Sequence, residues 1–237
     1  MGGVDFNGNH TLLDWKTGDV NGDGILDTVY LYGNVDGSPS IFADNITLVI
    51  RDGWSNKSTI VHFKNNAGYN ARLFLGDFNK NHIPDIMVSI DTGGSGGYGI
   101  FYIYSFKNNN LTELFNFDKY NEEYKFQLNY ADFYKVRVES HSPNRLFIID
   151  ISTKGPDYLS EYYDANGLLK KPIEGGVLAL GAVYPIITTN KSYNFDLVAL
   201  QRIIGPTNVD TLGYVENLLS WKGSQFHSNR LSVSIPF

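Results

Sequence analysis

Cysteine is absent from the sequence, which excludes disulfide bridges, thiolate metal sites, iron–sulfur clusters and cysteine nucleophiles. Charged residues make up only 19% of the chain, and they leave a net charge of −6. This acidity argues against nucleic acid, because proteins that bind it usually carry a basic face. The longest apolar stretch, residues 175–187, is too short and too rich in glycine to span a bilayer. We therefore expect no nucleic-acid partner and no membrane span.

Helical periodicity is also missing, because no long run repeats its apolar residues at the spacing of a helix face. Residues 157–163 fit either one short helix or a strand that leads into the turn at residues 164–167, and we favour the strand. Short alternating runs, bounded by Gly, Asn, Asp or Pro, recur along the chain instead. The 16 Tyr and 15 Phe residues favour strands as well. The sequence therefore predicts an all-β protein.

Two acidic loops repeat along the chain. Residues 18–27 read GDVNGDGILD, and residues 76–85 read GDFNKNHIPD at an offset of 58 residues (76 minus 18). Each lies between an apolar run and a predicted strand, and residues 188–196 form a third, decayed copy. A period of this size fits a four-stranded propeller blade with long loops.

From this period we predict a single β-propeller-like domain over residues 1–237, with about four blades, five being the alternative. The last predicted strand, residues 231–235, would pair with the first, residues 12–15, and close the ring. The approximate repeats are residues 9–66, 67–124, 125–178 and 179–237.

The first loop has the residue types and the spacing of a calcium site. Calcium binds about six to eight hard oxygens at about 2.3–2.6 Å. Asp19, Asn21 and Asp23 alternate on one tight turn, Gly24 follows where positive φ is needed, and Asp27 completes the set. Three carboxylates this close repel one another unless a cation lies between them. A solvated turn rich in Asp and Asn is the alternative.

An EF-hand is excluded, because the twelfth position is Tyr30 in a predicted strand, where an EF-hand has an acidic residue and then a helix. An acidic residue at position nine, followed by a strand, resembles the FG-GAP/VCBS repeats of integrin α-like β-propellers. The resemblance covers the two loops and their flanking strands. It implies a structural Ca²⁺ bound by the side chains of Asp19, Asn21, Asp23 and Asp27 and by the carbonyl of Ile25.

The second loop departs from this pattern, because Asn81 replaces the middle aspartate, His82 replaces the glycine, and Lys80 lies among the acidic residues. We expect a weaker second site there and no metal at the third loop, where Asp196 is the one carboxylate left. By the same resemblance, the ligands of the second site are Asp77, Asn79, Asn81, Ile83 and Asp85.

Other patterns suggest catalysis, but each lacks a necessary partner. Residues 93–97 read GGSGG and match a nucleophile elbow, which needs a helix behind it, whereas a strand is predicted there. The five histidines lack metal-ligand spacing, and Glu122 and Glu123 lack a partner carboxylate. We therefore expect no catalytic residue.

By the resemblance, calcium stabilises the fold, and the expected partner is a protein or a carbohydrate at a cell or spore surface. The sequence shows no signal peptide, so an extracellular or surface location is an expectation drawn from the calcium site. The alternatives are a secreted hydrolase that acts on polysaccharide or phosphate ester, and a structural coat or matrix component. A cluster of acids would favour the hydrolase, and an exposed aromatic shelf would favour a carbohydrate binder.

Overall fold

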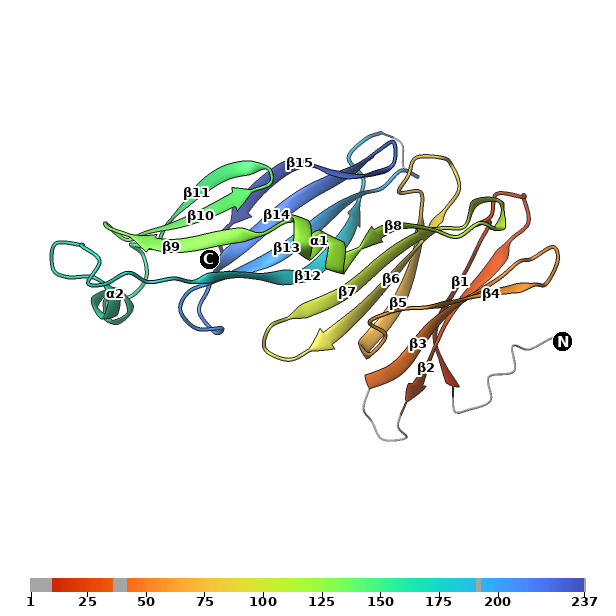
Figure 1. Ribbon diagram of the computed structural model, residues 1–237, viewed down its shortest axis with the longest axis horizontal. Coiled ribbons are helices and arrows are strands. Elements are labelled where there is room, and N and C mark those ends of the chain that lie inside the picture. Colours follow the sequence, from red (N-terminus) through yellow and green to blue (C-terminus); the bar gives the residue numbers. More distant parts are fainter. Residues whose placement is uncertain (1–9, 36–41, 191–192, 237) are drawn as a thin grey trace. The chain divides into compact units, whose positions relative to one another are not determined.

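The computed structural model describes residues 10–35, 42–190 and 193–236, and it confirms the all-β prediction (Figure 1). The strands form sheets of eight, three and four strands. The chain divides into two compact units. The first unit comprises Met1–Phe117, Tyr184–Leu197 and Ser220–His227, and the second comprises Asp118–Val183, Val198–Leu219 and Ser228–Phe237.

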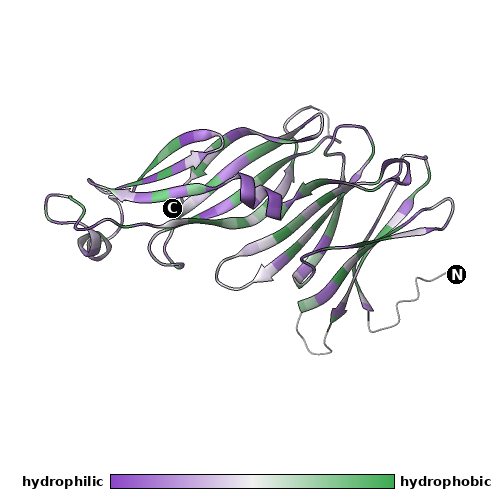
Figure 2. Ribbon diagram, in the orientation of Figure 1, coloured by the Kyte–Doolittle hydropathy of each residue, from purple (hydrophilic) through white to green (hydrophobic). Residues whose placement is uncertain are grey.

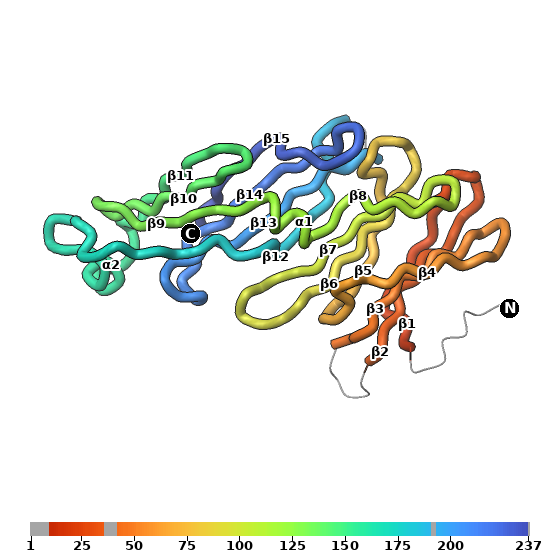
Figure 3. Tube along the Cα trace, viewed as in Figure 1, coloured from red at the N-terminus to blue at the C-terminus, as the bar shows by residue number. Residues whose placement is uncertain are grey.

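The eight-stranded sheet belongs to the first unit and has the order β1-β2-β3-β5-β6-β7-β8, with β4 paired to β3 (Figure 3). All pairs are antiparallel. A 3₁₀ turn, η1, follows β7. The bounds are β1 His10–Gly18, β2 Asp27–Val35, β3 Phe42–Arg51, β4 Ser58–His62, β5 Gly68–Gly76, β6 Asp85–Gly93, β7 Tyr98–Ser105, η1 Lys107–Asn109 and β8 Thr112–Asn116.

The core of the first unit follows from the strand periodicity. Buried and half-buried residues alternate along β2, as in a strand with one face towards the core. The apolar sequences of β6 and β7 are buried on both faces over most of their length, as nearly continuous apolar runs predict. Side chains from several strands form one cluster that includes Leu31, Leu48, Ile50, Val88 and Ile100.

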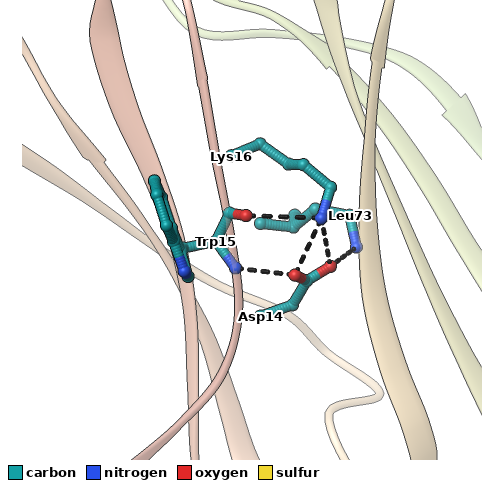
Figure 4. Close-up of polar contacts among 4 residues, drawn as sticks. All are labelled: Asp14, Trp15, Lys16 and Leu73. Carbon is teal, nitrogen blue, oxygen red and sulfur yellow. Dashed lines mark hydrogen bonds and ion pairs between the residues drawn. The ribbon is translucent and has the colours of Figure 1, made fainter.

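Strand β1 is tied to β5, although the two are not neighbours in the sheet order. The β1–β2 register shifts between Leu12 and Asp14, and the Asp14 carboxylate accepts a hydrogen bond from the backbone N–H of Leu73 in β5 at 2.8 Å (Figure 4). The backbone N–H of Trp15 and the Nζ of Lys16 also donate to it, at 2.8 and 2.9 Å. This carboxylate therefore holds an edge strand against the middle of the sheet.

The other two sheets supply the core of the second unit. Side chains from both, including Tyr130, Val138, Leu212 and Val215, form one apolar cluster. Figure 2 shows hydrophilic and hydrophobic bands alternating along these strands, which is the period-2 pattern of the sequence. The bounds are α1 Phe117–Glu123, β9 Phe126–Ala131, β10 Lys135–His141, β11 Asn144–Asp150, α2 Pro156–Tyr162, β12 Gly176–Ile186, β13 Asp196–Ile204, β14 Thr211–Lys222 and β15 Gln225–Ser234.

The propeller is not confirmed. The strands of the first two predicted repeats, residues 9–66 and 67–124, join one sheet, and no set of four-stranded blades is found in the described part of the chain. The expected pairing of residues 231–235 with residues 12–15 is absent there too, since β15 pairs with β14 and β1 with β2. The chain has two compact units, and its division into four repeats within one domain stays a prediction.

Two local expectations have different outcomes. The predicted strand at residues 157–163 is wrong, because Pro156–Tyr162 forms α2. Proline is compatible with a helix at its first turn, and Tyr158, Leu159 and Tyr162 all pack on the second core from one helix face. The loop at residues 93–97 is a hairpin connection between β6 and β7, as expected. Among the described residues, the helices are too short and too polar to cross a membrane.

Candidate metal site in the aspartate loops

The two acidic loops connect neighbouring antiparallel strands in the same way. Gly18 pairs with Asp27 where the β1–β2 hairpin opens into the first loop. Gly76 pairs with Asp85 where the β5–β6 hairpin opens into the second. Each loop is therefore a hairpin connection whose ninth residue, an aspartate, begins the next strand.

The first loop folds inward onto its own backbone. The carboxylate of Asp19 accepts hydrogen bonds from the N–H groups of Gly22 at 2.7 Å, Asp23 at 3.1 Å and Gly24 at 2.9 Å. Oδ1 of Asp23 accepts one from the N–H of Ile25 at 2.8 Å. Asp and Asn side chains stabilise turns in this manner, which explains why the loop is tight without a buried core of its own.

Asp27 closes the first loop from the side of β2. Its Oδ2 accepts hydrogen bonds from the N–H groups of Val20 at 3.0 Å and Asn21 at 3.2 Å, and its Oδ1 accepts one from Gly53 at 2.9 Å. Oδ1 of Asn21 accepts the N–H of Asp23 at 2.9 Å. Asp27 and Asn21 are buried, at 0% and 1% exposure. The predicted side-chain ligands thus surround one small segment of backbone.

The second loop repeats most of this hydrogen bonding. Asp77 accepts the N–H groups of Asn81 at 3.0 Å and His82 at 2.9 Å, and Asn81 accepts that of Ile83 at 2.9 Å. Asp85 accepts the N–H groups of the two residues that follow Asp77. Because an asparagine oxygen accepts the same bond as an aspartate oxygen, the loop keeps its shape with one carboxylate fewer.

Two positions in each loop are left-handed. In the first loop they are Gly22 and Gly24, with φ of 82° and 88°, and in the second they are Lys80 and His82, with φ of 64° and 69°. Positive φ at Gly24 was expected. Side chains other than glycine rarely adopt this conformation, so Lys80 and His82 are held there by the loop's hydrogen bonds at a cost in free energy.

The pKa values and the ion pairs of the carboxylates distinguish the first two loops from the third. Burial raises the pKa of Asp27 above its usual value, and it raises that of Asp85 to about 7. No basic side chain of the described residues forms an ion pair with Asp19, Asp23 or Asp27. The first loop therefore gathers three carboxylates without a protein cation.

At the third loop the cation is a lysine. Asp196, the first residue of β13, is 3% exposed, and its Oδ1 lies 3.0 Å from Nζ of Lys80 in the second loop. A buried carboxylate that has such a partner does not need a metal. Lys191 and Ser192 of this loop lie outside the described residues.

The three loops lie side by side within the first unit. A Cβ on Gly22 would be 2.5 Å from Cδ1 of Ile83, so the first loop touches the second. The N–H of Phe195 donates to the carbonyl of Asp77 at 2.9 Å, and a Cβ on Gly76 would meet the Phe195 ring, so the second loop touches the third. The sequence predicted the loops one at a time and did not predict this contact between them.

The residue types of the first loop fit calcium, although its carboxylates face the loop backbone. No group of three or more His, Cys, Asp or Glu among the described residues is placed to hold a metal ion. The predicted ligands Asp19, Asn21, Asp23, Ile25 and Asp27 offer only oxygens, which is what a hard cation binds. A carboxylate oxygen that accepts one N–H keeps a second lone pair. Calcium at this loop stays a prediction, as does the weaker second site.

Comparison with known proteins identifies the family. A family described as "YybI C-terminal domain" matches residues 124–234. Over 219 residues the chain is 44% identical to the uncharacterized protein YybI of Bacillus subtilis (strain 168), covering 92% of this chain and 82% of that protein. The chain belongs to the YybI family. No solved structure matches it.

Membership of the YybI family corrects the assignment made from the loops. The FG-GAP/VCBS prediction is wrong, because the family found is YybI and no FG-GAP/VCBS repeat family is found. A nine-residue hairpin loop is a local motif, and a local motif does not specify the fold around it. The match to the YybI C-terminal domain begins at residue 124, after both loops.

The YybI C-terminal domain of this chain contains a polar cluster that the sequence patterns did not predict. The hydroxyl of Tyr158 in α2 donates to Oδ2 of Asp210 at 2.6 Å, and Nζ of Lys154 lies 3.1 Å from Oδ1. Oη of Tyr130 lies 2.6 Å from Oη of Tyr158. Burial raises the pKa of Tyr158 above its usual range. The cluster fastens α2 to the β13–β14 turn, and its members are too far apart in sequence to form a motif.

Proposed function

We propose that the chain is a calcium-binding module in which one Ca²⁺ at the first loop stabilises the β1–β2 hairpin. The observation that carries the proposal is three carboxylates on one nine-residue loop, with no ion pair to a basic side chain among the described residues. Like charges at such a loop destabilise it unless a cation is bound. The ligands are Asp19, Asn21, Asp23 and Asp27 by their side chains and Ile25 by its carbonyl.

A second, weaker calcium site is proposed at the second loop. It has two carboxylates instead of three, and the raised pKa of Asp85, about 7, means that a proton competes with the metal near neutral pH. Its ligands are Asp77, Asn79, Asn81, Ile83 and Asp85.

The role proposed for the calcium-stabilised module is the binding of a protein or a carbohydrate outside the cell or at a cell or spore surface. Extracellular calcium modules bind with dissociation constants of about 10⁻⁴–10⁻³ M, which suits a loop whose residues 22–26 are exposed. An exposed tryptophan, Trp54, beside a pocket that has both polar and apolar lining side chains favours binding over hydrolysis. The proposal does not extend to a propeller, because the described strands form sheets of eight, three and four strands.

Calorimetric melting tests the calcium proposal. If calcium is present at about ten times its dissociation constant, it should stabilise the chain by about 1.4 kcal/mol, which raises Tm by about 3–6 °C over the chelated protein. Asp23→Ala should abolish this difference. Asp164→Ala is the matched control, because Asp164 also accepts two backbone N–H groups in a turn but has no loop of carboxylates around it. Equal melting with calcium and with chelator, or a calcium effect that survives Asp23→Ala, would overturn the proposal.

A further inference from the structure

A pocket of about 330 Å³ opens beside the first loop, within the first unit. One wall is the turn that joins β3 to β4, which contributes Asp52, Trp54 and Lys57. The opposite wall is η1, which contributes Asn109. The volume lies within the range of about 300–1,000 Å³ that is usual for small-ligand sites.

Trp54 is held at the rim of this pocket with its ring in solvent. It is 76% exposed, which is unusual for the largest apolar side chain. Its position is fixed by Asp52, whose carboxylate accepts the N–H groups of Trp54 at 2.7 Å and Ser55 at 3.1 Å and the hydroxyl of Ser55 at 2.9 Å. These hydrogen bonds fix the backbone of the turn, and the turn presents the indole of Trp54 to solvent.

The opposite wall is built from two left-handed asparagines that have contacts to both the turn and the first loop. Asn108 and Asn109 have φ of 55° and 60°, a conformation that asparagine adopts more readily than other non-glycine residues. The N–H of Asn108 donates to the carbonyl of Asn21 at 2.8 Å, and Oδ1 of Asn109 accepts Nδ2 of Asn21 at 3.2 Å. Nδ2 of Asn109 reaches Oδ2 of Asp52 at 3.4 Å. These bonds place a carboxylate and an amide together at the pocket.

We infer that this pocket binds a neutral saccharide, with one sugar ring stacked on Trp54 and its hydroxyl groups bonded to Asn109 and Lys57. A sugar ring has an apolar C–H face, which an indole covers, and a rim of hydroxyls, which pair with acceptors and donors at once. A protein partner would need Trp54 to be surrounded by apolar, water-excluding neighbours, whereas those in the pocket are mostly polar. The inference rests on the binding role proposed above and names its ligand class.

The test titrates the full chain, in calcium, with three neutral disaccharides: cellobiose, maltose and N,N′-diacetylchitobiose. Saturation-transfer NMR and tryptophan fluorescence report binding. At least one disaccharide should bind saturably, and Trp54→Ala and Asn109→Ala should each weaken that binding about tenfold or more. Trp15→Ala is the matched control, because Trp15 is also exposed, at 54%, on β1 of the same unit. Melting of each variant checks that it is folded.

Two results would overturn the inference. One is that none of the three disaccharides binds saturably. This result would overturn the inference even if Trp54 proved necessary for binding a protein partner. The other is that Trp54→Ala binds as tightly as the unaltered chain, or that Trp15→Ala is the variant that loses binding. A repeat in chelator separates this inference from the calcium proposal. Saccharide binding without any effect of calcium on melting would support the saccharide pocket and contradict the calcium site. Stabilisation by calcium without saccharide binding would support the calcium site and contradict the saccharide pocket.

Discussion

Backbone conformation at single residues separates the two acidic loops more sharply than their hydrogen bonds do. Both loops need left-handed residues at their fourth and sixth positions. Glycine fills both in the first loop, and Lys80 and His82 fill them in the second. The sixth position was predictable, because Gly24 follows Asp23 as glycine does in known calcium loops. The fourth was not, since Gly22 and Lys80 share no property that a sequence pattern records.

Gly24→Ala should lower the free energy of unfolding by about 1 kcal/mol, since a Cβ raises the cost of positive φ and part of this is offset in the unfolded chain. No atom lies within 4 Å of the added Cβ, so the cost is purely one of backbone conformation. Gly22→Ala should cost more, because its Cβ would also displace the Ile83 side chain. Urea unfolding with calcium chelated measures both.

Gly155→Ala is the control for this comparison. A Cβ added to Gly155 would also have no atom within 4 Å, but the φ of Gly155 is −57°. Its replacement should change the unfolding free energy by only a few tenths of a kcal/mol. A loss at Gly24 no larger than at Gly155 would show that the first loop does not hold the left-handed conformation in solution.

At the scale of elements, Asp14 is the contact that joins β1 to β5. Burial raises its pKa, but the hydrogen bonds from Lys16 and from the N–H groups of Leu73 and Trp15 lower it by more, so the pKa lies below its usual value of 3.8. A sequence pattern could not pair Asp14 with Leu73, because the partner is a backbone group 59 residues away.

A lowered pKa means that the charged form of Asp14 stabilises the folded chain. Its contribution should be complete above about pH 4 and should be lost as the pH falls through the lowered pKa. Asp14→Asn should therefore be less stable than the unaltered chain at pH 6, and the difference should shrink as the pH falls below 4. Unfolding free energies measured between pH 2 and pH 6 check this. A difference that stays constant across this range would show that the charge of Asp14 makes no contribution.

The elements themselves were predicted unevenly. Alternating runs located most strands, because about four or five consecutive residues are enough to show the two-residue period of a strand. Helix α2 was missed, because Tyr158 and Tyr162 are spaced for a helix but are also typical of strands. Their packing on the second core decided between the two. The shared fold of the acidic loops was predictable from their aspartates, whereas calcium within them remains a proposal.

At the scale of the whole molecule, the first unit is completed by segments from late in the chain. Phe195 contacts Phe74 and Phe78, with ring centroids 5.1 and 5.9 Å apart, and Phe226 contacts Phe115 at 6.0 Å. Phe78 is fully buried. The early strands therefore depend on residues that the ribosome adds much later.

Residues 1–117, expressed alone, should not melt cooperatively, although they contain every strand of the eight-stranded sheet. Loss of the segments Tyr184–Leu197 and Ser220–His227 exposes the rings of Phe74, Phe78 and Phe115, and uncovered aromatic surface of this size favours unfolding or aggregation. Circular dichroism on heating, with the full chain as the reference, measures this. A cooperative transition near that of the full chain would show that the early strands fold alone.

Three properties of this chain are local: its all-β class, its hairpin connections and the fold of each acidic loop. Local patterns of side-chain type are enough to determine them. The gathering of the three loops, the pairing of Lys80 with Asp196 and the walls of the Trp54 pocket are not local. Each joins segments that are distant in the sequence, and such contacts form only when the first unit folds around its own core. For this reason the residues of the proposed calcium site could be named from the sequence, whereas the residues of the proposed saccharide pocket could not.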